Sequence, residues 1–459
     1  MINILKRHIR NKKLLILGFG REGKSTYNLI RKLYPEMPLY IADKNEDLWM
    51  KNTFIQKDEN LVLILGDNYL DHLPQFELVI KSPGISLNHM THVSDATEIT
   101  SQTDLFMEAY RNQTIGITGS KGKSTTSSLI YHIISQYTEN CLIAGNIGIP
   151  AFDIISKIDN DSIIVYELSA HQLEFCKNAP DVSILLNLYE EHLDHFHSFE
   201  KYQNTKLRIA DLQRENSTFI YHADDHLIRT FVNDLSSTRN LFGYTNNSTI
   251  ARGCFIDDQK IWFADNRQSI MIFDLKDSMN LQGQHNYLNI MASILACLSL
   301  KIPIETIRKN ISTFKGLEHR LEFIGTYRDI KFYNDSIATI PEATMSAITT
   351  LETVDTLILG GFDRGIYYTS LLNFISESTI KNLLFTGTAG KRMMEEIHEL
   401  DIEDKTLIWL EDYVQIVDTA FKLTKAGKIC LLSPAAASYD SFWDFEQRGE
   451  VYKKLVEDY

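Results

Sequence analysis

The stretch Ile115-Gly-Ile-Thr-Gly-Ser-Lys-Gly-Lys-Ser-Thr-Thr126 decides how the chain around it folds. An apolar run typical of a buried strand ends in closely spaced glycines, and a helical pattern then covers residues 127–134. Small residues let backbone N–H groups turn towards phosphate oxygens, and the start of the following helix adds positive partial charge. This order of strand, loop and helix predicts a phosphate-binding loop.

The loop departs from the usual G-x-x-x-x-G-K-[ST] spacing, because the first glycine of that pattern would fall on Ile117. The alternative interpretation is a glycine- and serine-rich turn without a ligand. We favour ATP, since Lys123 can reach the β- and γ-phosphates and the Ser124 hydroxyl can bind Mg²⁺. The expected ATP contacts in this loop are Gly119, Ser120, Lys121, Gly122, Lys123, Ser124 and Thr125.

The composition of the 459 residues excludes several classes of partner. A formal net charge of −14 argues against nucleic acid and anionic membranes, because either needs a basic surface. The five cysteines are scattered singly, which indicates reduced core thiols rather than disulfides or a metal site. Residues 1–10 lack the apolar core of a signal peptide, and no apolar run is long enough for a membrane span. We therefore expect a cytoplasmic protein.

A second glycine-rich turn lies near the N-terminus. Residues 13–17 form a predicted strand, Gly18-Phe-Gly-Arg-Glu-Gly23 is the turn, residues 24–33 are a predicted helix, and the next strand ends in Asp43. This is a Rossmann-type pattern, with an acid about 20 residues after the turn. By itself the pattern indicates only that phosphates of a nucleotide-like ligand bind near the turn.

A third turn, Lys81-Ser-Pro-Gly84, follows the predicted strand at residues 78–80. Parallel sheets bind ligands at the carboxyl ends of their strands, so this turn is expected near the same ligand. A helix is expected between residues 98 and 113, leading into the phosphate-binding loop. The first domain boundary is placed within it.

Strands and helices alternate through the rest of the chain, which predicts an α/β fold. In the middle part we expect buried strands at 141–144, 162–169 and 182–187, short alternating strands over 216–273 and a helix at 286–300. Beyond them we expect hairpin strands at 320–324 and 331–333 and parallel strands at 356–359, 382–385, 406–409 and 428–432. The predicted domains are a Rossmann-like domain at 1–105, a central P-loop ATPase-like domain at 106–313 and a Rossmann-like C-terminal domain at 314–459.

Acidic and histidine side chains follow the strands after the phosphate-binding loop. Glu167 ends a predicted strand where its carboxylate can reach a metal beside Ser124. The segment Glu190-Glu-His-Leu-Asp-His-Phe-His197 follows the next strand. It could suggest zinc, but no cysteine accompanies it, and Mg²⁺ is preferred beside ATP. From the helical pattern alone, Lys206 is expected to be exposed.

Four polar segments are prominent in the C-terminal part of the chain. Three of them follow predicted strand ends, so we expect them to line one pocket for a carboxylate and the far side of a nucleotide. The segments are Gly316-Leu-Glu-His-Arg-Leu-Glu322, Asn334-Asp-Ser-Ile-Ala-Thr339, Gly360-Gly-Phe-Asp-Arg-Gly365 and Ser433-Pro-Ala-Ala-Ala-Ser438.

Taken in order, these motifs resemble the Mur ligases of peptidoglycan synthesis over nearly the whole chain. Besides the phosphate-binding loop, the matching segments are Gly145-Asn-Ile-Gly148, Glu167-Leu-Ser-Ala-His-Gln-Leu-Glu174, Glu191-His-Leu-Asp194, His285-Asn286 with Asn289, His319-Arg320 and Asn334-Asp-Ser336. The turn at Lys81 and the segment from Ser433 through Phe445-Glu-Gln-Arg-Gly449 resemble the members that add glutamate to UDP-N-acetylmuramoyl-L-alanine.

The resemblance implies an ATP-dependent amide ligase, a monomer whose partners are small molecules, which activates the substrate carboxylate as an acyl phosphate. The implied catalytic set is Lys123 on the ATP phosphates, Ser124 and Glu167 on one Mg²⁺, and His192 and a carbamylated Lys206 on a second Mg²⁺. Asn286, Asn289, Arg320 and Asp335 would contact adenine, ribose or phosphate. The implied contacts to the UDP-sugar and the amino acid are Gly20, Arg21, Asp43, Ser82, Pro83, Gly84, Asn146, Thr339, Arg364, Ser438 and Phe445.

Departures from the family pattern leave alternatives open. Ile337 and Arg364 stand where two lysines are usual, and the first-domain turn carries Arg21 and Glu22 instead of small residues. D-glutamate is the expected amino acid, and L-glutamate is the alternative. A folate-type polyglutamate ligase shares the central motifs but would lack the N-terminal turn, and a non-catalytic UDP-sugar-binding homologue would not need the catalytic set.

Overall fold

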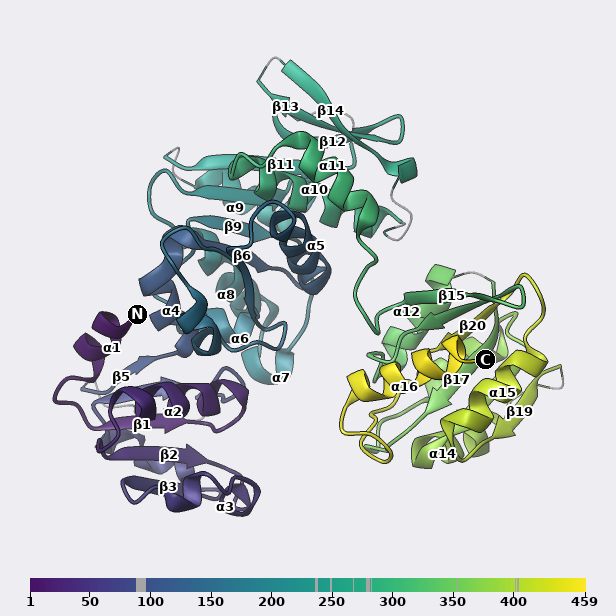
Figure 1. Cartoon of the computed structure of the whole chain (residues 1–459), viewed down its shortest axis with the longest axis horizontal. Coiled ribbons are helices and arrows are strands. Elements are labelled where there is room, and N and C mark those ends of the chain that lie inside the picture. The colour runs from purple at the N-terminus through teal and green to yellow at the C-terminus, as the bar shows by residue number, and fades with distance from the viewer. Residues whose placement is uncertain are drawn as a thin grey trace. The chain divides into compact units, whose positions relative to one another are not determined.

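The computed structural model describes residues 1–87, 96–235, 238–247, 250–266, 268–277, 281, 283–351, 353–400, 402 and 404–459. The chain forms two compact units, Met1–Phe314 and Lys315–Tyr459. Three β-sheets organise the described residues, two in the first unit and one in the second, with helices between the strands (Figure 1). The predicted α/β fold class is confirmed.

The first sheet consists of five parallel strands near the N-terminus. Its strands are β1 (Leu14–Leu17), β2 (Leu39–Asp43), β3 (Leu61–Leu65), β4 (Leu78–Lys81) and β5 (Glu98–Thr100), in the order β3-β2-β1-β4-β5. Its helices are α1 (Ile2–Ile9), α2 (Arg21–Leu33), α3 (Leu48–Lys51) and α4 (Gln102–Tyr110), with 3₁₀ turns at Ile55–Lys57, Tyr69–Gln75 and Arg111–Gln113. Every residue of β1 and β4 is buried, as expected for parallel strands covered on both faces.

The central sheet has nine strands in the order β14-β13-β12-β11-β10-β9-β6-β8-β7. They are β6 (Thr114–Thr118), β7 (Cys141–Gly145), β8 (Ile163–Glu167), β9 (Val182–Leu185), β10 (Thr218–His222), β11 (Asn240–Thr245), β12 (Arg252–Asp257), β13 (Lys260–Asp265) and β14 (Gln268–Asp274). The helices are α5 (Lys123–Ser135), α6 (Ala170–Leu173), α7 (Leu193–Phe196), α8 (Phe199–Asp211), α9 (His226–Asp234), α10 (Gln284–Ser299) and α11 (Ile304–Thr313), with 3₁₀ turns at Ala151–Lys157 and Leu275–Asp277.

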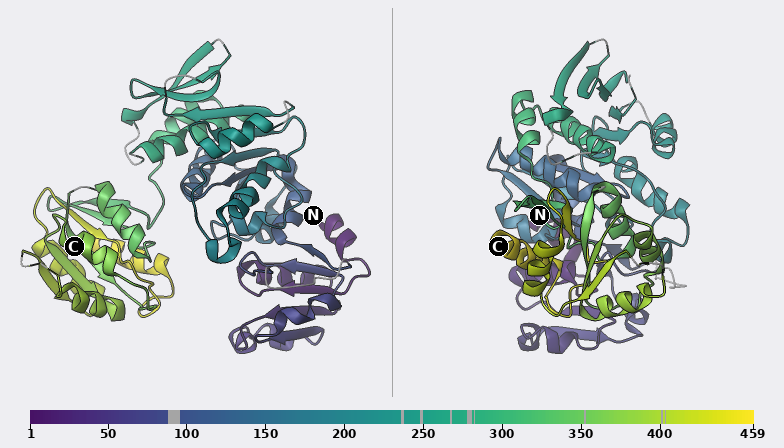
Figure 2. Two further views of the ribbon diagram at one scale, coloured as in Figure 1. Left: turned by 180° about the vertical axis from the view of Figure 1, so that it is seen from behind. Right: turned by 90° about the vertical axis from the view of Figure 1, so that its right-hand side faces the viewer.

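The strand pairing of the central sheet changes from parallel to antiparallel towards one edge. From β7 to β12 all neighbouring strands are parallel, whereas β12, β13 and β14 pair antiparallel. This antiparallel extension projects at the top of both views in Figure 2. The phosphate-binding loop follows β6 in the parallel part, so the extension lies away from it along the sheet.

One apolar core joins the first sheet to the central sheet. It contains Leu5 and Phe106 from the N-terminal part of the chain, together with Phe152 and Tyr166 from the central part. The ring centroids of Phe106 and Tyr166 lie 5.5 Å apart. Burial of apolar surface is the main favourable term in folding, so this joint core accounts for the two sheets forming one compact unit.

The third sheet forms the second unit, with strands in the order β15-β16-β20-β17-β18-β19. They are β15 (Glu322–Tyr327), β16 (Ile330–Asn334), β17 (Val354–Gly360), β18 (Asn382–Thr386), β19 (Thr406–Trp409) and β20 (Ile429–Leu432). The helices are α12 (Pro341–Leu351), α13 (Thr369–Ser376), α14 (Gly387–Ile397), α15 (Tyr413–Leu423) and α16 (Phe445–Glu457). β15 and β16 form the predicted hairpin, and the other strands are parallel.

The helix predicted between residues 98 and 113 is wrong over its first part. Glu98–Thr100 forms the edge strand β5, which pairs with β4. Ser101 then caps α4, because its side chain accepts a hydrogen bond from Asp104 N–H. A helix cannot begin before its cap, so the segment divides at Ser101.

The short strands predicted for residues 216–273 include an unpredicted helix, α9. β10 and β11 are parallel neighbours, and parallel neighbours need a crossover instead of a tight turn. The Asp225 side chain caps this crossover helix by accepting from Leu227 N–H and Ile228 N–H. The signal was present in the sequence as an Asp before an apolar periodic run.

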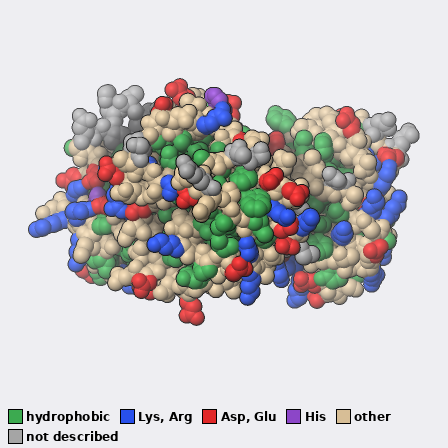
Figure 3. All heavy atoms as spheres, turned by 90° about the horizontal axis from the view of Figure 1, so that it is seen from above, with side chains coloured by type: hydrophobic (Ala, Val, Ile, Leu, Met, Phe, Trp, Pro, Cys, Tyr) green, Lys and Arg blue, Asp and Glu red, His purple; other side chains and the backbone are tan. Residues whose placement is uncertain are grey.

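The surface carries charges of both signs. Acidic and basic side chains are scattered over the face drawn in Figure 3. The sequence has 60 acidic and 46 Lys or Arg side chains, so basic groups remain numerous although the net charge is negative. None of the described helices is both long and apolar enough to span a bilayer.

A buried arginine ties together the loops at the end of the third sheet. Arg448, in α16, is 1% exposed and donates to Ser336 Oγ at 2.9 Å and Ser336 O at 2.8 Å. It also donates to Ala436 O at 3.0 Å and Ala437 O at 3.2 Å. One guanidinium thereby joins α16 to the segments that follow β16 and β20, and its planar set of donors suits this task.

We predict that Arg448→Met lowers the free energy of unfolding of the C-terminal unit by about 3 kcal/mol, because buried carbonyl groups lose their donors. Hydrogen exchange of β17 and β20 in urea, followed by mass spectrometry of the full chain, measures the loss. Arg392→Met is the control, since Arg392 is partly exposed and pairs with Asp363 at 2.7 Å. Its loss should be about 1 kcal/mol or less. Equal losses in both variants would contradict the structural role of Arg448.

Candidate active site

The phosphate-binding loop runs from the end of β6 to the start of α5. Gly122 has φ 86°, and a Cβ at this position would lie 2.5 Å from Asn289 Oδ1. Glycine is therefore required on both conformational and steric grounds. Asn187 fixes the loop from the neighbouring strand end, because its side chain accepts from Lys121 N–H at 2.8 Å and donates to Lys121 O at 3.1 Å.

Lys123 opens helix α5, four residues earlier than the helical pattern predicted. Its ammonium donates to Gly119 O at 2.8 Å and to Ser120 O at 2.7 Å. A phosphate oxygen would be a stronger acceptor for this ammonium than either neutral carbonyl. Ser124 and Thr125 lie in the same first helical turn, where N–H groups have no partner within the helix.

Glu167 ends β8 beside the phosphate-binding strand, since Glu167 pairs with Ile117 of β6. The side chain is 1% exposed, and Oε1 accepts from Asn146 Nδ2 at 2.7 Å. Oε2 is buried and has no hydrogen-bond partner among the described residues. An uncompensated buried carboxylate oxygen is costly, and oxygen is the ligand that Mg²⁺ prefers. Glu167 therefore fits a metal ligand.

Lys206 is buried, so the sequence-based expectation of an exposed helix lysine is wrong. It lies in α8 with 1% exposure, and Nζ donates to Gly119 O at 2.8 Å and to Thr118 Oγ1 at 3.3 Å. Burial lowers the pKa of Lys206 well below its usual value, and the charge of Lys123 lowers it further. A neutral amine is the form that reacts with CO₂, so this environment fits the carbamate that the resemblance implies.

His192 stands at the start of α7, with φ 56° in the left-handed region. Burial lowers the pKa of His192, Glu191 opposes this shift, and Lys206 and Lys123 add to it. A neutral imidazole is the form that binds metals. Charges on Lys123 and Glu167 likewise act on Lys206, so the predicted catalytic residues gather around one loop.

The asparagines expected near the nucleotide lie on α10. Asn289 accepts from Thr126 Oγ1 at 3.3 Å and donates to Asn286 Oδ1 at 3.4 Å. Asn289 thereby sits directly against the phosphate-binding loop at Gly122. Both asparagines lie beside the loop on which the predicted ATP contacts are built.

A pocket of about 380 Å³ lies at the carboxyl ends of β1 and β4. Two contacts shape its rim: Asp43 accepts from Phe19 N–H at 2.7 Å, and Ser82 Oγ donates to Gly18 O at 2.9 Å. The sequence-predicted residues that line it are Gly20, Arg21, Asp43, Ser82, Pro83 and Gly84. The structure thus brings together the two turns that the sequence identified separately.

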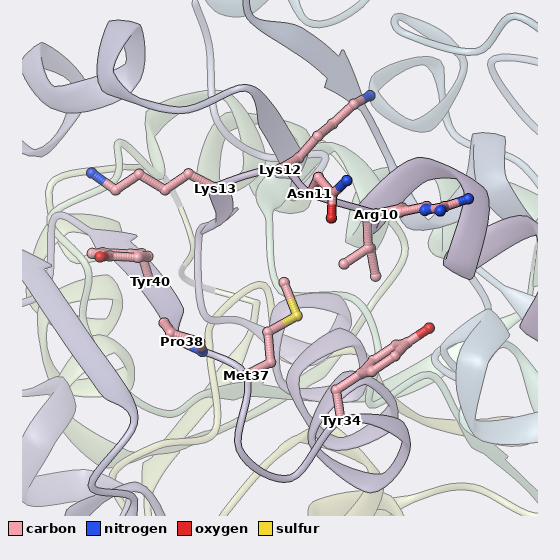
Figure 4. Close-up of a pocket in the computed structure, with 9 residues that line it drawn as sticks. Arg10, Asn11, Lys12, Lys13, Tyr34, Met37, Pro38 and Tyr40 are labelled. Carbon is pink, nitrogen blue, oxygen red and sulfur yellow. The ribbon is translucent and has the colours of Figure 1, made fainter.

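A second hollow of the first sheet, about 500 Å³, lies at the opposite end, where β1 and β2 begin. Tyr40 and Tyr34 flank Met37 in this hollow (Figure 4). The ammonium of Lys13 lies 4.8 Å above the Tyr40 ring. The hollow is lined by none of the residues that the motifs identified, and it is separate from the pocket at the carboxyl ends.

Contacts join the polar segments of the C-terminal unit to one another. Arg364 Nη2 donates to Thr339 O at 2.7 Å, and Phe362 forms a β-bridge with Ala437, next to Ser438. Ser336 Oγ donates to Phe445 O at 2.7 Å. These contacts join the ends of β16, β17 and β20 to the start of α16.

Asp335 lies buried at the centre of this set. It accepts from Leu321 N–H at 3.2 Å and from Ser433 Oγ at 2.8 Å. Burial raises the pKa of Asp335 to about 6, although both hydrogen bonds and the charge of Arg320 oppose the shift. Arg320 itself is exposed.

Sequence reasoning did not select Glu22, which is half-buried in the lining of the pocket. Its Oε1 accepts from Gln172 Nε2 at 2.7 Å, across the contact between the first and central sheets. Burial raises the pKa of Glu22 to about 7, while Gln172 and Lys81 oppose the shift. The glycine pattern identified the turn at residues 18–23, but the partial burial of Glu22 depends on its contact with the distant Gln172.

These features are typical of the phosphate-loop class of nucleotide-binding proteins, with a carboxylate, an imidazole and a buried amine at the loop. A family model described as the Mur ligase middle domain matches residues 117–297. A UDP-N-acetylmuramoylalanine–D-glutamate ligase from Acetivibrio thermocellus is 30% identical, covering 99% of this chain and 98% of that protein. The ligase of the same name from Desulfitobacterium hafniense is 32% identical, with 98% of each chain covered.

Solved structures with the same fold are also Mur ligases. MurC from Thermotoga maritima has a TM-score of 0.55 at 16% identity, covering 98% of this chain and all of that one. MurF from Thermotoga maritima in complex with ADP has a TM-score of 0.54 at 15% identity, covering 99% of this chain and 97% of that one. The chain therefore belongs to the Mur ligase family, as the motifs predicted. Its full-length similarity places it in the branch of the UDP-N-acetylmuramoylalanine–D-glutamate ligases.

We predict that Glu22 makes stability depend on pH. Because its folded pKa of about 7 exceeds its ordinary value of 4.5, folding is favoured at low pH and loses stability as pH rises through 7. Glu22→Gln should remove up to about 3 kcal/mol of the stability difference between pH 5 and pH 8. Calorimetric unfolding at both pH values measures this.

Glu139→Gln, on an exposed loop after α5, is the matched control and should keep the wild-type pH dependence. A Glu22→Gln protein with the same pH dependence as wild type would show that Glu22 titrates normally.

Proposed function

We propose that the chain is an ATP-dependent amide ligase that adds D-glutamate to UDP-N-acetylmuramoyl-L-alanine, acting as a monomer in the cytoplasmic stage of peptidoglycan synthesis. The observation that carries the proposal is the cluster of Glu167, His192 and Lys206 around the phosphate-binding loop. The full-length similarity to ligases of this name supports the choice of substrates. Similarity through the N-terminal sheet disfavours a folate-type ligase.

The first chemical step is phosphoryl transfer. A carboxylate oxygen of the UDP-sugar substrate attacks the γ-phosphorus of ATP, the bond to ADP breaks, and an acyl phosphate forms. Lys123 would hold the transferred phosphoryl group, whose charge must be stabilised as the bonds change. Ser124 and Glu167 would hold one Mg²⁺, and His192 with a carbamate on Lys206 would hold another. Bound Mg²⁺ supplies positive charge that neutralises the phosphate oxygens.

The second step is amide formation. The neutral amine of glutamate attacks the acyl carbon, the nitrogen gives up one proton to solvent, and phosphate leaves from the tetrahedral intermediate, which gives the amide. The groups proposed to hold glutamate are Arg364, Thr339, Ser438 and Phe445 in the C-terminal unit. Arg364 is an exposed cation anchored to Thr339, and its guanidinium can bind a carboxylate through two hydrogen bonds.

The stereochemistry of glutamate has a second candidate. Ile337 is half-buried and offers no charge where a lysine is usual, so Arg364 must serve a carboxylate with a different geometry. The names of the relatives favour D-glutamate, whereas this departure favours L-glutamate. We retain D-glutamate as the proposed substrate.

A phosphate-release assay tests the proposed reaction. Purified protein is mixed with ATP, Mg²⁺, UDP-N-acetylmuramoyl-L-alanine and either enantiomer of glutamate. We expect phosphate and a glutamyl product, identified by mass, with D-glutamate and not with L-glutamate. Lys123→Ala should be inactive and serves as the background. Turnover with L-glutamate alone would reverse the stereochemical assignment, and turnover with neither would refute the ligase.

We predict that Lys206→Ala loses about 100-fold or more of the activity, because the site loses a negatively charged ligand beside the phosphates. Acetate should restore part of the rate by supplying a carboxylate in the space left by the side chain. Steady-state phosphate release with increasing acetate measures the rescue. Lys201→Ala, on the exposed side of the same helix, should retain wild-type activity. Full activity of Lys206→Ala without acetate would exclude the carbamate.

A further inference from the structure

A chain of buried polar side chains connects the pocket of the first sheet to His192. It begins at Lys81, the last residue of β4, which is 2% exposed. The ammonium donates to Ser82 O at 3.2 Å and to Pro83 O at 3.3 Å. Ser82 and Pro83 line the pocket, so Lys81 holds the backbone of its rim from behind.

Glu174, just after α6, is the next member. Its Oε2 lies 3.9 Å from Lys81 Nζ and 3.0 Å from His195 Nε2. The carboxylate and the imidazole are both largely buried, with 12% and 7% of their side chains exposed. Glu174 Oε2 thus lies between the Lys81 ammonium and the imidazole of His195, which belongs to the same segment as His192.

Imidazole rings complete the connection. The His195 ring packs edge-on against His171, with centroids 4.4 Å apart and an angle of 71°. His171 packs in the same way against His192, with centroids 4.9 Å apart and an angle of 77°. Edge-to-face packing fixes the orientation of a ring as well as its position. The orientation of His192 therefore depends on the rings behind it.

The charges in this chain leave little freedom for its members to move independently. Burial lowers the pKa of Lys81 to about 8, while Glu174 and Glu22 oppose the shift. The ammonium is therefore mostly charged at neutral pH and needs its carboxylate partner in a buried setting. Through these contacts a shift of the Ser82–Pro83 backbone would reach the Lys81 ammonium, then the shared Glu174 oxygen, and then His195.

We infer that Lys81 and Glu174 are positioning residues that couple occupancy of the first-sheet pocket to the placement of His192 at the phosphate-binding loop. The inference rests on the proposed function, since it assigns the UDP-sugar to this pocket and ATP to the loop. The chemistry gives a reason for such coupling: ATP held productively without the acceptor carboxylate can only lose its phosphate to water. Coupling between two binding sites is reciprocal, so either ligand can report it.

The experiment measures the affinity of a non-hydrolysable ATP analogue with Mg²⁺, with and without saturating UDP-N-acetylmuramoyl-L-alanine, by calorimetry. In the wild type we expect the UDP-sugar to tighten analogue binding about 5-fold or more. In Lys81→Met and in Glu174→Gln this factor should fall below about 2-fold, within the range of uncoupled sites. The affinity for the analogue alone is measured in every variant as the reference, so that a direct effect on His192 is separated from a change in the coupling between the two ligands. The double variant should lose nothing further if both act in one chain.

Lys405→Met is the matched control. Lys405 is a buried lysine that also donates to two carbonyls, Ser378 O at 2.8 Å and Ile380 O at 2.9 Å. It lies 4.0 Å from Asp404, in the C-terminal unit. Lys405→Met therefore also removes a buried lysine, but away from the proposed chain. In this variant the UDP-sugar should tighten analogue binding as much as in the wild type.

The outcomes separate this inference from the proposed function. If the wild type binds neither ligand, the proposed function fails. If the wild type binds both ligands but the UDP-sugar does not tighten analogue binding, the inference alone is overturned. The same holds if Lys81→Met and Glu174→Gln keep the wild-type tightening. Should Lys81→Met fail to fold, Glu174→Gln decides, because it keeps the size of the side chain and removes only its charge.

Discussion

One buried oxygen of Glu167, to which the described residues offer no hydrogen bond, is the constraint around which the candidate site is arranged. Removing a carboxylate from water is unfavourable unless a cation or a donor compensates it. Asn146 donates to one oxygen, and the charge of the carboxylate acts on Lys206. The same burial that makes this oxygen costly also lowers the pKa of Lys206 well below its usual value, which favours the neutral amine. A metal ion would resolve both conditions at once, since it binds the carboxylate and stabilises a carbamate.

Both sites of the first unit follow from one property of parallel sheets. In the first sheet β1 lies between β2 and β4, and in the central sheet β6 lies between β8 and β9. Loops that follow such strands leave in opposite directions and open a space at the carboxyl end of the sheet. The pocket lined by Ser82 lies at this end of the first sheet, and the phosphate-binding loop that leads to Lys123 lies at this end of the central sheet. The order of the strands therefore determines where ligands can bind before any side chain is considered.

The sequence predicted those features that depend on neighbouring residues. The short apolar run at residues 406–409, for example, predicted the strand Thr406–Trp409 at its observed bounds. Glu98–Thr100 was missed as a strand, because pairing with β4 is a contact between distant segments. Lys206 was predicted to be exposed from its helical pattern, since a pattern cannot show which polar face another segment covers. Glu22 and Glu174 escaped selection because their burial arises only where two sheets meet. The roles of the site residues remain predictions.

The apolar core shared by the first two sheets limits how this protein could have been assembled from parts. Phe106 follows the first sheet and packs on Tyr166 of the central sheet, so one face of each sheet belongs to a shared interior. A chain ending after the first sheet would expose one side of that interior to water. Exchange of the N-terminal sheet for that of another nucleotide-binding protein would therefore require a matching surface on β8. The N-terminal sheet therefore cannot be moved to another protein without its partner surface, although its Gly18–Gly23 turn follows the Rossmann-type pattern.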